Sequence, residues 1–143
     1  VAIGDNRIRQ TRMAALAAHG YRGATIIHPA ATVSDHAEIG AGTAVLAGAI
    51  VNARAQVSEG CIVNTGAIVE HDVHLGSFTH MSPGAVAAGG ARIGARCWIG
   101  ANAVVRHGVR IGDNVVLGAL CFASDDLPEP GTYVGAPARP IPR

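Results

Sequence analysis

Residues 57–93 read VSEGCI VNTGAI VEHDVH LGSFTH MSPGAV AAGGAR I when the chain is divided into sixes. Each six opens on an apolar residue, and a small side chain follows four positions later. The same register runs without insertion or deletion from Ile27 to Leu117, through sixteen consecutive sixes. A period this regular indicates a solenoid, and hexapeptides are typical of a parallel β-helix.

The repeat also predicts how the chain is divided. At three sixes per coil, residues eighteen apart stack on the same face of neighbouring coils, and sixteen sixes make about five coils. We therefore predict a mainly β fold. Residues 1–28 would be the C-terminal remnant of a small α/β domain that binds a nucleotide sugar. Residues 29–122 would form the β-helix, and residues 123–143 an extended tail.

The composition supports a solenoid and excludes several functions. Of the 143 residues, 49% are hydrophobic but only 3% are aromatic, and glycine occurs 19 times. The net charge of +1, without a basic run, gives no support to nucleic-acid binding. No uninterrupted apolar stretch is long enough to span a membrane, and there is no secretory signal pattern.

The three cysteines, Cys61, Cys97 and Cys121, all fall on the small position of the repeat. This predicts buried thiols rather than reactive ones. Cys61 and Cys97 would lie two coils apart, roughly 9–10 Å, which is too far for a disulfide. The pattern fits a reducing cytoplasm, where we expect the protein to be located.

The two ends of the chain are expected to cover the solenoid. Residues 1–3 predict a strand, residues 7–19 a helix with Ile8 and Leu16 facing inward, and residues 25–27 a second strand. This order is typical of the closing half of an α/β domain, and a chain that starts at Val1 rather than Met is typical of a fragment. The strand edges at both ends of a β-helix need covers, which this unit and the proline-rich tail would supply.

One column of stacked positions places His71 beside Gly89, one coil later. The six that holds Gly89, AAGGAR, has the weakest core of the series, so we expect a thin wall where something can approach the backbone. Glu70 and Asp72 flank the histidine. These features predict a catalytic His71, with a solvated corner histidine as the alternative. His107 shares the column two coils away, and its role stays open.

Two further columns predict ligand contacts. Trp98 stacks on His80, so His80 is expected either to touch a ligand or to pack against the indole. Arg92 stacks on Arg110 about 5 Å away, and two guanidinium groups at that distance repel each other unless an anion lies across them. A phosphate-bearing ligand would account for the pair, and a solvated face is the alternative.

The sixes resemble those of the left-handed β-helix acyltransferases, and the residues around His71 narrow the resemblance. The stretch NTGAIVEHD at residues 64–72, followed by HMSPGA at residues 80–85, resembles the family of sialic-acid O-acetyltransferases and nucleotide-amino-sugar N-acetyltransferases. AIGDNR at residues 2–7 and VGAPAR at residues 134–139 are similar as well, so the resemblance covers essentially the whole chain. The left-handedness of the coil is implied by this resemblance alone.

The resemblance implies a homotrimer that uses acetyl-CoA, with sites between neighbouring subunits. His71 would be the general base, and Asp72 would raise its basicity. The residues expected to bind acetyl-CoA are His80, Gly89, Arg92, Arg110 and Arg139, and those expected at the sugar nucleotide are Ile3, Gly4, Asp5 and Glu70. Since the opening half of the α/β domain is absent, we expect good binding of acetyl-CoA and weak binding of the sugar nucleotide.

The predicted function is N-acetylation of a nucleotide-linked amino sugar by direct transfer, in the context of cell-surface glycan synthesis that the resemblance implies. No cysteine lies at an activated position, which disfavours an acyl-enzyme. Three alternatives stay open: O-acetylation of a sialic acid, a metal-dependent lyase like the γ-class carbonic anhydrases, and a non-catalytic trimeric scaffold. Against a metal site, His74 and His80 occupy the same position on successive faces and should diverge, whereas zinc needs three or four converging ligands.

Overall fold

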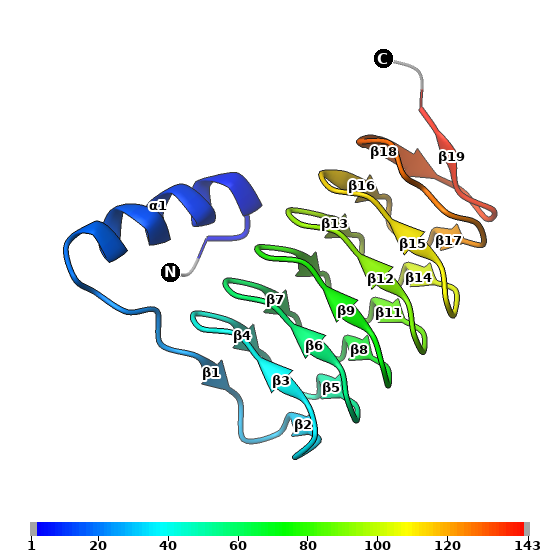
Figure 1. The fold of residues 1–143 in the computed structure, drawn as a ribbon. Coiled ribbons are helices and arrows are strands. Elements are labelled where there is room, and N and C mark those ends of the chain that lie inside the picture. Colours follow the sequence, from blue (N-terminus) through cyan, green and yellow to red (C-terminus); the bar gives the residue numbers. More distant parts are fainter. Residues whose placement is uncertain (1–2, 142–143) are drawn as a thin grey trace.

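The computed structural model describes residues 3–141 and consists of one helix followed by a solenoid of short strands (Figure 1). Helix α1 (Asn6–Ala18) precedes all of the strands. Of the strand predicted at residues 1–3, Val1 and Ala2 lie outside the described residues, and Ile3 is not part of a strand. Among residues 3–141, no helix is both long enough and apolar enough to cross a membrane.

The strands form three sheets that are parallel except for β19, and each of the first five coils contributes one strand to every sheet. The first sheet contains β1 (Ile26–Ile27), β4 (Ala44–Val45), β7 (Ile62–Val63), β10 (His80–Met81), β13 (Trp98–Ile99), β16 (Val115–Leu117), β18 (Gly131–Val134) and β19 (Arg139–Pro140). The second sheet contains β2 (Thr32–Val33), β5 (Ile50–Val51), β8 (Ile68–Val69), β11 (Val86–Ala87), β14 (Val104–Val105) and β17 (Phe122–Ala123). The third sheet contains β3 (Glu38–Ile39), β6 (Gln56–Val57), β9 (His74–Leu75), β12 (Arg92–Ile93) and β15 (Arg110–Ile111).

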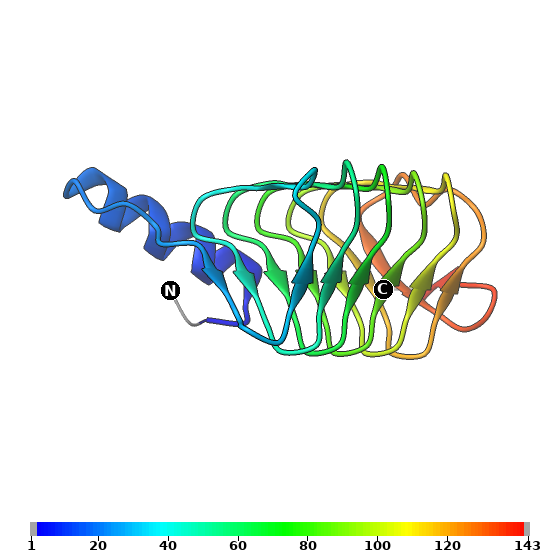
Figure 2. The same cartoon turned by 90° about the horizontal axis from the view of Figure 1, so that it is seen from below.

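The register from β1 to β17 is the one that the repeat predicts, because each of these cross-coil pairs joins residues eighteen apart, whereas β18 pairs with β16 at a separation of sixteen. Ile62 pairs with His80, and His80 with Trp98, in the first sheet. In the two-residue strands of the inner coils the second residue points inward, so that Val63, Met81 and Ile99 are completely buried. Figure 2 shows the coils stacked in layers along one axis. This stacking confirms the predicted parallel β-helix.

The coils turn at three corners, and two of them matter for the site. The histidine corner joins the second sheet to the third, at residues 52–55, 70–73, 88–91 and 106–109. The helix corner joins the third sheet to the first, at residues 58–61, 76–79 and 94–97. Many of the turns contain one residue with a left-handed backbone conformation. At the histidine corner these residues are Arg54, Asp72, Gly90 and Gly108, with φ between 59° and 70°.

Helix α1 docks on the helix corner through polar side chains. Asp5 caps the helix by accepting a hydrogen bond from the N–H of Ile8 at 2.8 Å. Asn6 donates to the carbonyl of Cys97, and Arg9, only 1% exposed, donates to the carbonyls of Gly60 and Phe78. The prediction of an inward apolar face was wrong, since Ile8 and Leu16 are 51% and 44% exposed and the buried residues are polar.

The two ends of the solenoid differ from each other. At the C-terminal end the expected cover is confirmed, because β18 pairs with β16 and adds a rung beyond the coils counted from the repeat, and β19 then pairs antiparallel with β18. At the other end, α1 runs along the corner and projects past the first coil (Figure 2), so that Ile26 and Ile27 are 60% and 47% exposed. The expected cover of the first coil by the N-terminal unit is therefore wrong for the residues described.

The boundary predicted at residue 29 also shifts. Ile26 and Ile27 pair with Ala44 and Val45, so the second strand of the expected α/β unit is the first strand of the solenoid. The assignment of the preceding residues to the remnant of a nucleotide-sugar domain stays a prediction.

Candidate active site

His71 stands on the histidine corner, in the turn between β8 and β9, and leans over the next coil. A Cβ atom placed on Gly89 would lie 2.7 Å from both Cε1 and Nε2 of the imidazole. The N–H of Gly90 donates to the carbonyl of His71 at 2.9 Å, which confirms that the two coils are stacked in the predicted register. The missing side chain at position 89 is therefore what leaves room for the ring.

The imidazole of His71 is held by its neighbour Asp72. The distance from Nδ1 of His71 to Oδ2 of Asp72 is 2.8 Å, and the two side chains are 63% and 39% exposed. Since a carboxylate only accepts hydrogen bonds, this contact assigns the proton of the neutral ring to Nδ1. Nε2, the atom beside Gly89, is then left with a free lone pair that can accept a proton.

Arg54, one coil earlier, binds the other side of the same carboxylate. Its Nε donates to Oδ1 of Asp72 at 2.7 Å, and its second guanidinium nitrogen donates to Oδ2 at 3.1 Å. The hydrogen bonds from Arg54, and after them the one from His71, lower the pKa of Asp72 to about 2. Asp72 is therefore an anion at any pH at which the protein would work.

Arg54 is a residue of this corner that was not predicted from the sequence, although the register contained the signal. Arg54 lies eighteen residues before Asp72, so the two residues share a column. This column is next to the one that holds His71 and Gly89. Glu70 is also close to the histidine, because its Oε2 atom accepts a hydrogen bond from the N–H of His71 at 3.3 Å.

His80 lies in different surroundings, on β10 of the first sheet. Its ring centroid is 4.7 Å from that of Trp98, and its Nε2 atom is 3.0 Å from Nδ2 of Asn64. The residue is only 6% exposed. Burial, and after it the charge of Arg9, lowers the pKa of His80 to about 4, an effect that the nearby carbonyl of Gly4 opposes. The predicted packing of His80 on Trp98 is confirmed, and the imidazole is neutral at pH 7.

The loop at residues 3–5 is on another corner from His71. The carbonyls of Ile3 and Gly4 accept hydrogen bonds from Arg9, whose other contacts tie it to the helix corner. The Asp5 carboxylate is occupied as the cap of α1. One chain therefore does not bring the residues expected at the sugar nucleotide together with the expected base, apart from Glu70.

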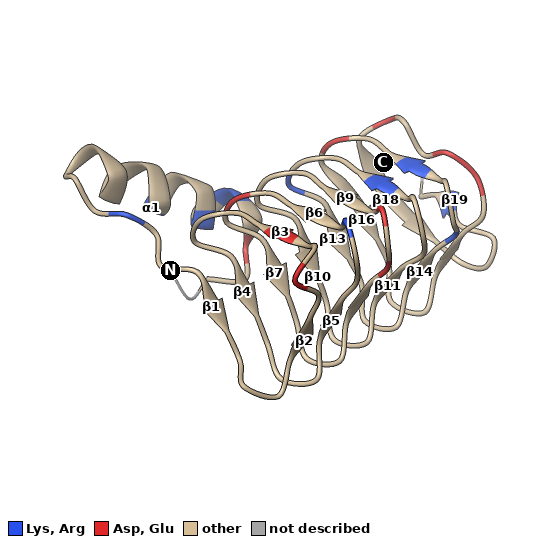
Figure 3. Cartoon of the chain, turned by 60° about the horizontal axis from the view of Figure 1, so that its bottom comes forward, with Lys and Arg blue, Asp and Glu red and all other residues tan. Residues whose placement is uncertain are grey.

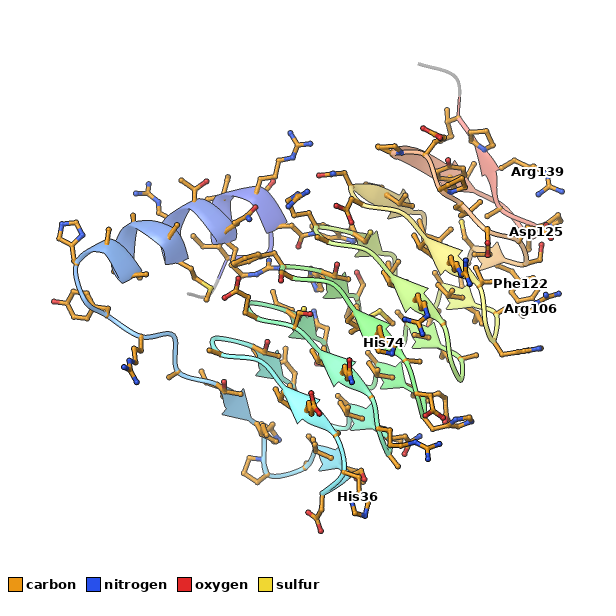
Figure 4. All side chains as sticks on the ribbon, viewed as in Figure 1. His36, His74, Arg106, Phe122, Asp125 and Arg139 are labelled. Atoms are coloured by element: carbon orange, nitrogen blue, oxygen red, sulfur yellow. The ribbon has the colours of Figure 1, made fainter. Side chains whose placement is uncertain are left out.

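The three arginines expected at acetyl-CoA are divided between two places. Arg92 and Arg110 are stacked and exposed on the third sheet, in line with His74 of the preceding coil. Figure 4 shows His74 pointing outward from β9 and Arg139 on β19, past the last coil. Charges of both signs are spread along the solenoid (Figure 3), and within residues 3–141 neither Arg92 nor Arg110 forms an ion pair.

Other potential sites carry less chemistry. A hollow of about 490 Å³ beside α1 is lined by residues such as Met13, Tyr21 and Phe78, and His71 does not contribute to it. In the described part of the chain, no three His, Cys, Asp or Glu side chains are grouped so that they could hold a metal ion. The three cysteines are buried and free, and burial raises the pKa of Cys61 and of Cys97 to about 11.

Comparison with known proteins places this geometry in a family. A family model of bacterial transferase hexapeptide repeats matches residues 90–122. The acetyltransferase domain of PglB from Neisseria gonorrhoeae, also solved in complex with acetyl coenzyme A, is 43% identical with a TM-score of 0.97, over 99% of this chain and 69% of that one. PerB from Caulobacter crescentus, solved with CoA and GDP-perosamine, is 40% identical with a TM-score of 0.98, again over 99% and 69%.

A third structure supports the fold alone. WeeI from Acinetobacter baumannii has a TM-score of 0.94 at 23% identity and covers 98% of this chain and 68% of its own. No curated protein sequence matches the chain. The repeat, the three parallel sheets and the similarity to PglB and PerB over nearly the whole chain together lead to one conclusion: the chain belongs to the left-handed β-helix acetyltransferases of the bacterial hexapeptide-repeat family.

Proposed function

We propose that this protein transfers the acetyl group of acetyl-CoA to the amino group of a nucleotide-linked amino sugar, with His71 as the general base. The observation that carries the proposal is the free Nε2 atom of His71 beside Gly89, with Nδ1 bonded to Asp72. The names of the relatives supply the substrate class, because PglB was solved with acetyl coenzyme A and PerB with CoA and GDP-perosamine.

The reaction needs one proton acceptor and no covalent intermediate. The amine nitrogen of the sugar attacks the thioester carbonyl, so that a C–N bond forms while the proton of the amine passes to Nε2 of His71, directly or through a water. The C–S bond then breaks, and the departing thiolate of CoA takes the proton back from the imidazolium. General-base assistance of this kind contributes roughly 10²–10⁴-fold to the rate.

Asp72 supports both stages of this transfer. It fixes the ring with the proton on Nδ1 before the attack, and its negative charge stabilises the imidazolium that forms afterwards. Buried thiols whose pKa is raised by burial are poor nucleophiles, so a cysteine acyl-enzyme finds no support.

Gly89 is proposed to contribute its backbone as well as its missing side chain. Among the described residues, none accepts a hydrogen bond from the N–H of Gly89, whereas the N–H of Gly90 is bonded to His71. A free N–H beside the base can stabilise the negative charge that develops on the carbonyl oxygen of the thioester. This arrangement supports the assignment of Gly89 to the acetyl-CoA site.

The remaining contacts with acetyl-CoA are proposed for His80, Arg92, Arg110 and Arg139. Arg92 and Arg110 are partners on neighbouring strands of the third sheet, which starts at the histidine corner, and the phosphates of CoA could offset the repulsion between their charges. Replacing both with Gln should raise the KM for acetyl-CoA several-fold while kcat stays the same. Equal KM values in the variant and the wild type would show that Arg92 and Arg110 are ordinary solvent-exposed residues that do not bind acetyl-CoA.

We further propose that three copies of the chain share their sites. The second sheet carries apolar outward residues along five coils: Ile50, Ile68, Val86, Val104 and Phe122. Much of the outer surface of the first sheet is apolar too, whereas the outward residues of the third sheet are polar. If the first sheet of one copy packs against the second sheet of the next, threefold rotation closes the assembly. The histidine corner then borders the helix corner of the neighbour, where Ile3, Gly4 and Asp5 are expected to meet the sugar nucleotide.

The deciding experiment offers acetyl-CoA and a panel of nucleotide-linked amino sugars to the purified chain, with product mass and released thiol as readouts. We expect a gain of one acetyl group on an amino sugar, and a higher melting temperature when acetyl-CoA binds. Sedimentation should give the mass of three chains. A protein that releases no thiol with any amino sugar, and that acetyl-CoA does not stabilise, would contradict the proposal.

A further inference from the structure

We infer that Arg54 is a positioning residue for the reaction: by binding Asp72, its guanidinium fixes the orientation of His71 and limits its basicity. The inference rests on the proposed acetyl transfer, because it concerns the same histidine. Arg54 would act on the reacting atoms only through Asp72 and His71. Its removal is expected to shift the pH dependence of kcat/KM in the direction opposite to that of removing the Asp72 carboxylate.

The contacts of Asp72 form a chain of three side chains. Both nitrogens of the Arg54 fork are bonded to the carboxylate, at 2.7 Å and 3.1 Å, and Oδ2 is shared with Nδ1 of His71. A bidentate fork fixes the plane of a carboxylate as well as its distance. Without Arg54, Asp72 would be held only by His71 and could rotate on this exposed corner.

The ion pair between Arg54 and Asp72 contributes little to the stability of the fold. Arg54 and Asp72 both have left-handed φ angles, 59° and 60°, at a position that the next two coils fill with Gly90 and Gly108. This conformation costs energy in any residue with a Cβ atom, and an ion pair whose arginine is 75% exposed gives little stability in return. Arg96 and Asn114 share this backbone and are bonded in the same way at a corner without a histidine, so what distinguishes Arg54 and Asp72 is the contact of Asp72 with His71.

The sign of the electrostatic effect follows from the groups around His71. Glu70 and Asp72 lie on its own turn, Arg54 lies one coil before, and Arg106 and His107 lie on the coil beyond Gly89 and Gly90. Asp72 stabilises the imidazolium, whereas the positive charge of Arg54 opposes it. Removing Arg54 should make His71 a stronger base but a less well oriented one.

The test is Arg54→Gln in the full chain. We expect kcat to fall about tenfold because the base is less well oriented, with the KM of both substrates unchanged. The acidic limb of kcat/KM should move to higher pH by about half a unit. Arg54→Lys keeps the charge but not the fork, so it should lower kcat without moving the limb.

A matched control exists at the helix corner. Arg96 has the same left-handed backbone, with φ 56°, and its side chain is bonded to Asn114 with Asp113 nearby. Arg96→Gln should leave kcat and the pH profile unchanged. In an Asp72→Asn background, Arg54→Gln should cause no further loss, since it acts through that carboxylate.

Three results would overturn the inference. The first is an unchanged kcat and pH profile in Arg54→Gln, and the second is a full additional loss of kcat when Arg54→Gln is combined with Asp72→Asn. The third is a raised KM with unchanged kcat in Arg54→Gln, which would make Arg54 a ligand-binding residue. An NMR titration of His71 in substrate-free protein tests the coupling independently of turnover. The midpoint should be higher in Arg54→Gln than in the wild type, and equal midpoints would count against the inference. If the wild type transfers no acetyl group but the midpoint shifts, the proposed function fails while the coupling stands.

Discussion

His71 and His80 are separated by eight residues and differ in almost every physical respect. His71 is the third residue of its six, on a corner, with 63% of its side chain exposed and one nitrogen bonded to a carboxylate. His80 is the last residue of its six, on a strand, only 6% exposed and packed on Trp98. The place of a histidine within the repeat therefore decides whether it is exposed on a corner, as the proposed base is, or packed and neutral inside the protein.

Removing the imidazole of His71 is the strongest challenge to this comparison. His71→Asn should lower kcat by about 10²–10⁴-fold, because an amide in place of the imidazole cannot act as a general base. Calorimetry should find acetyl-CoA binding retained. Turnover near the wild-type value would show that the exposed histidine is not the base.

Filling the gap beside His71 should have the next largest effect. Gly89→Ala puts a Cβ atom 2.7 Å from Nε2, and because the backbone of Gly89 is not left-handed, the only conflict is with the imidazole. A ring displaced by about 1 Å would lower kcat roughly 10²-fold. Gly131→Ala is the matched control, since its Cβ atom would make only an ordinary 3.7 Å contact with Tyr133. Equal kcat values for the two variants would count against the role of the gap.

Asp72→Asn should have a smaller effect, and one of opposite sign to Arg54→Gln in its pH dependence. We expect a fall in kcat of roughly tenfold, well below the loss seen in a buried triad, because Asp72 is exposed and shares its charge with Arg54. Loss of the carboxylate destabilises the imidazolium, so the acidic limb of kcat/KM should move to lower pH. Asp72 itself, with a pKa of about 2, stays ionised across this range. A pH profile identical to that of the wild type would contradict the pairing.

His80, the buried histidine, should affect the pH dependence of the unfolding free energy. Because the pKa of His80 falls from 6.5 to about 4 on folding, its neutral form supports the fold fully above pH 6.5. The support is lost as the pH drops toward 4, since the unfolded chain then binds the proton more readily. His80→Gln removes this term, so the unfolding free energy of the wild type should fall by about 2 kcal/mol more than that of the variant between pH 7 and pH 5.

Chemical denaturation at the two pH values measures this difference. The matched control is His36→Gln, at an exposed corner of an early coil (Figure 4), which should behave like the wild type. If wild type and His80→Gln lose the same free energy, the imidazole of His80 is not kept neutral by its surroundings.

The sequence predicts most of the solenoid because a fixed period determines which residues touch. That period placed His71 by Gly89, His80 by Trp98 and Arg92 by Arg110, and each pair is confirmed. The orientation of α1 could not be predicted in this way. It depends on Asn6 and Arg9 finding backbone carbonyls far along the chain, and such contacts leave no periodic signal. For the same reason an apolar face was expected where the helix docks through polar groups.

A coil of constant length makes the solenoid modular. A single residue inserted between positions 71 and 89 would shift every later side chain by one place, turning core residues outward and separating the imidazole from its gap. A whole block of eighteen residues added after residue 110 would lengthen the protein and leave this corner unchanged. The number of coils and the chemistry at His71 can therefore vary independently of each other.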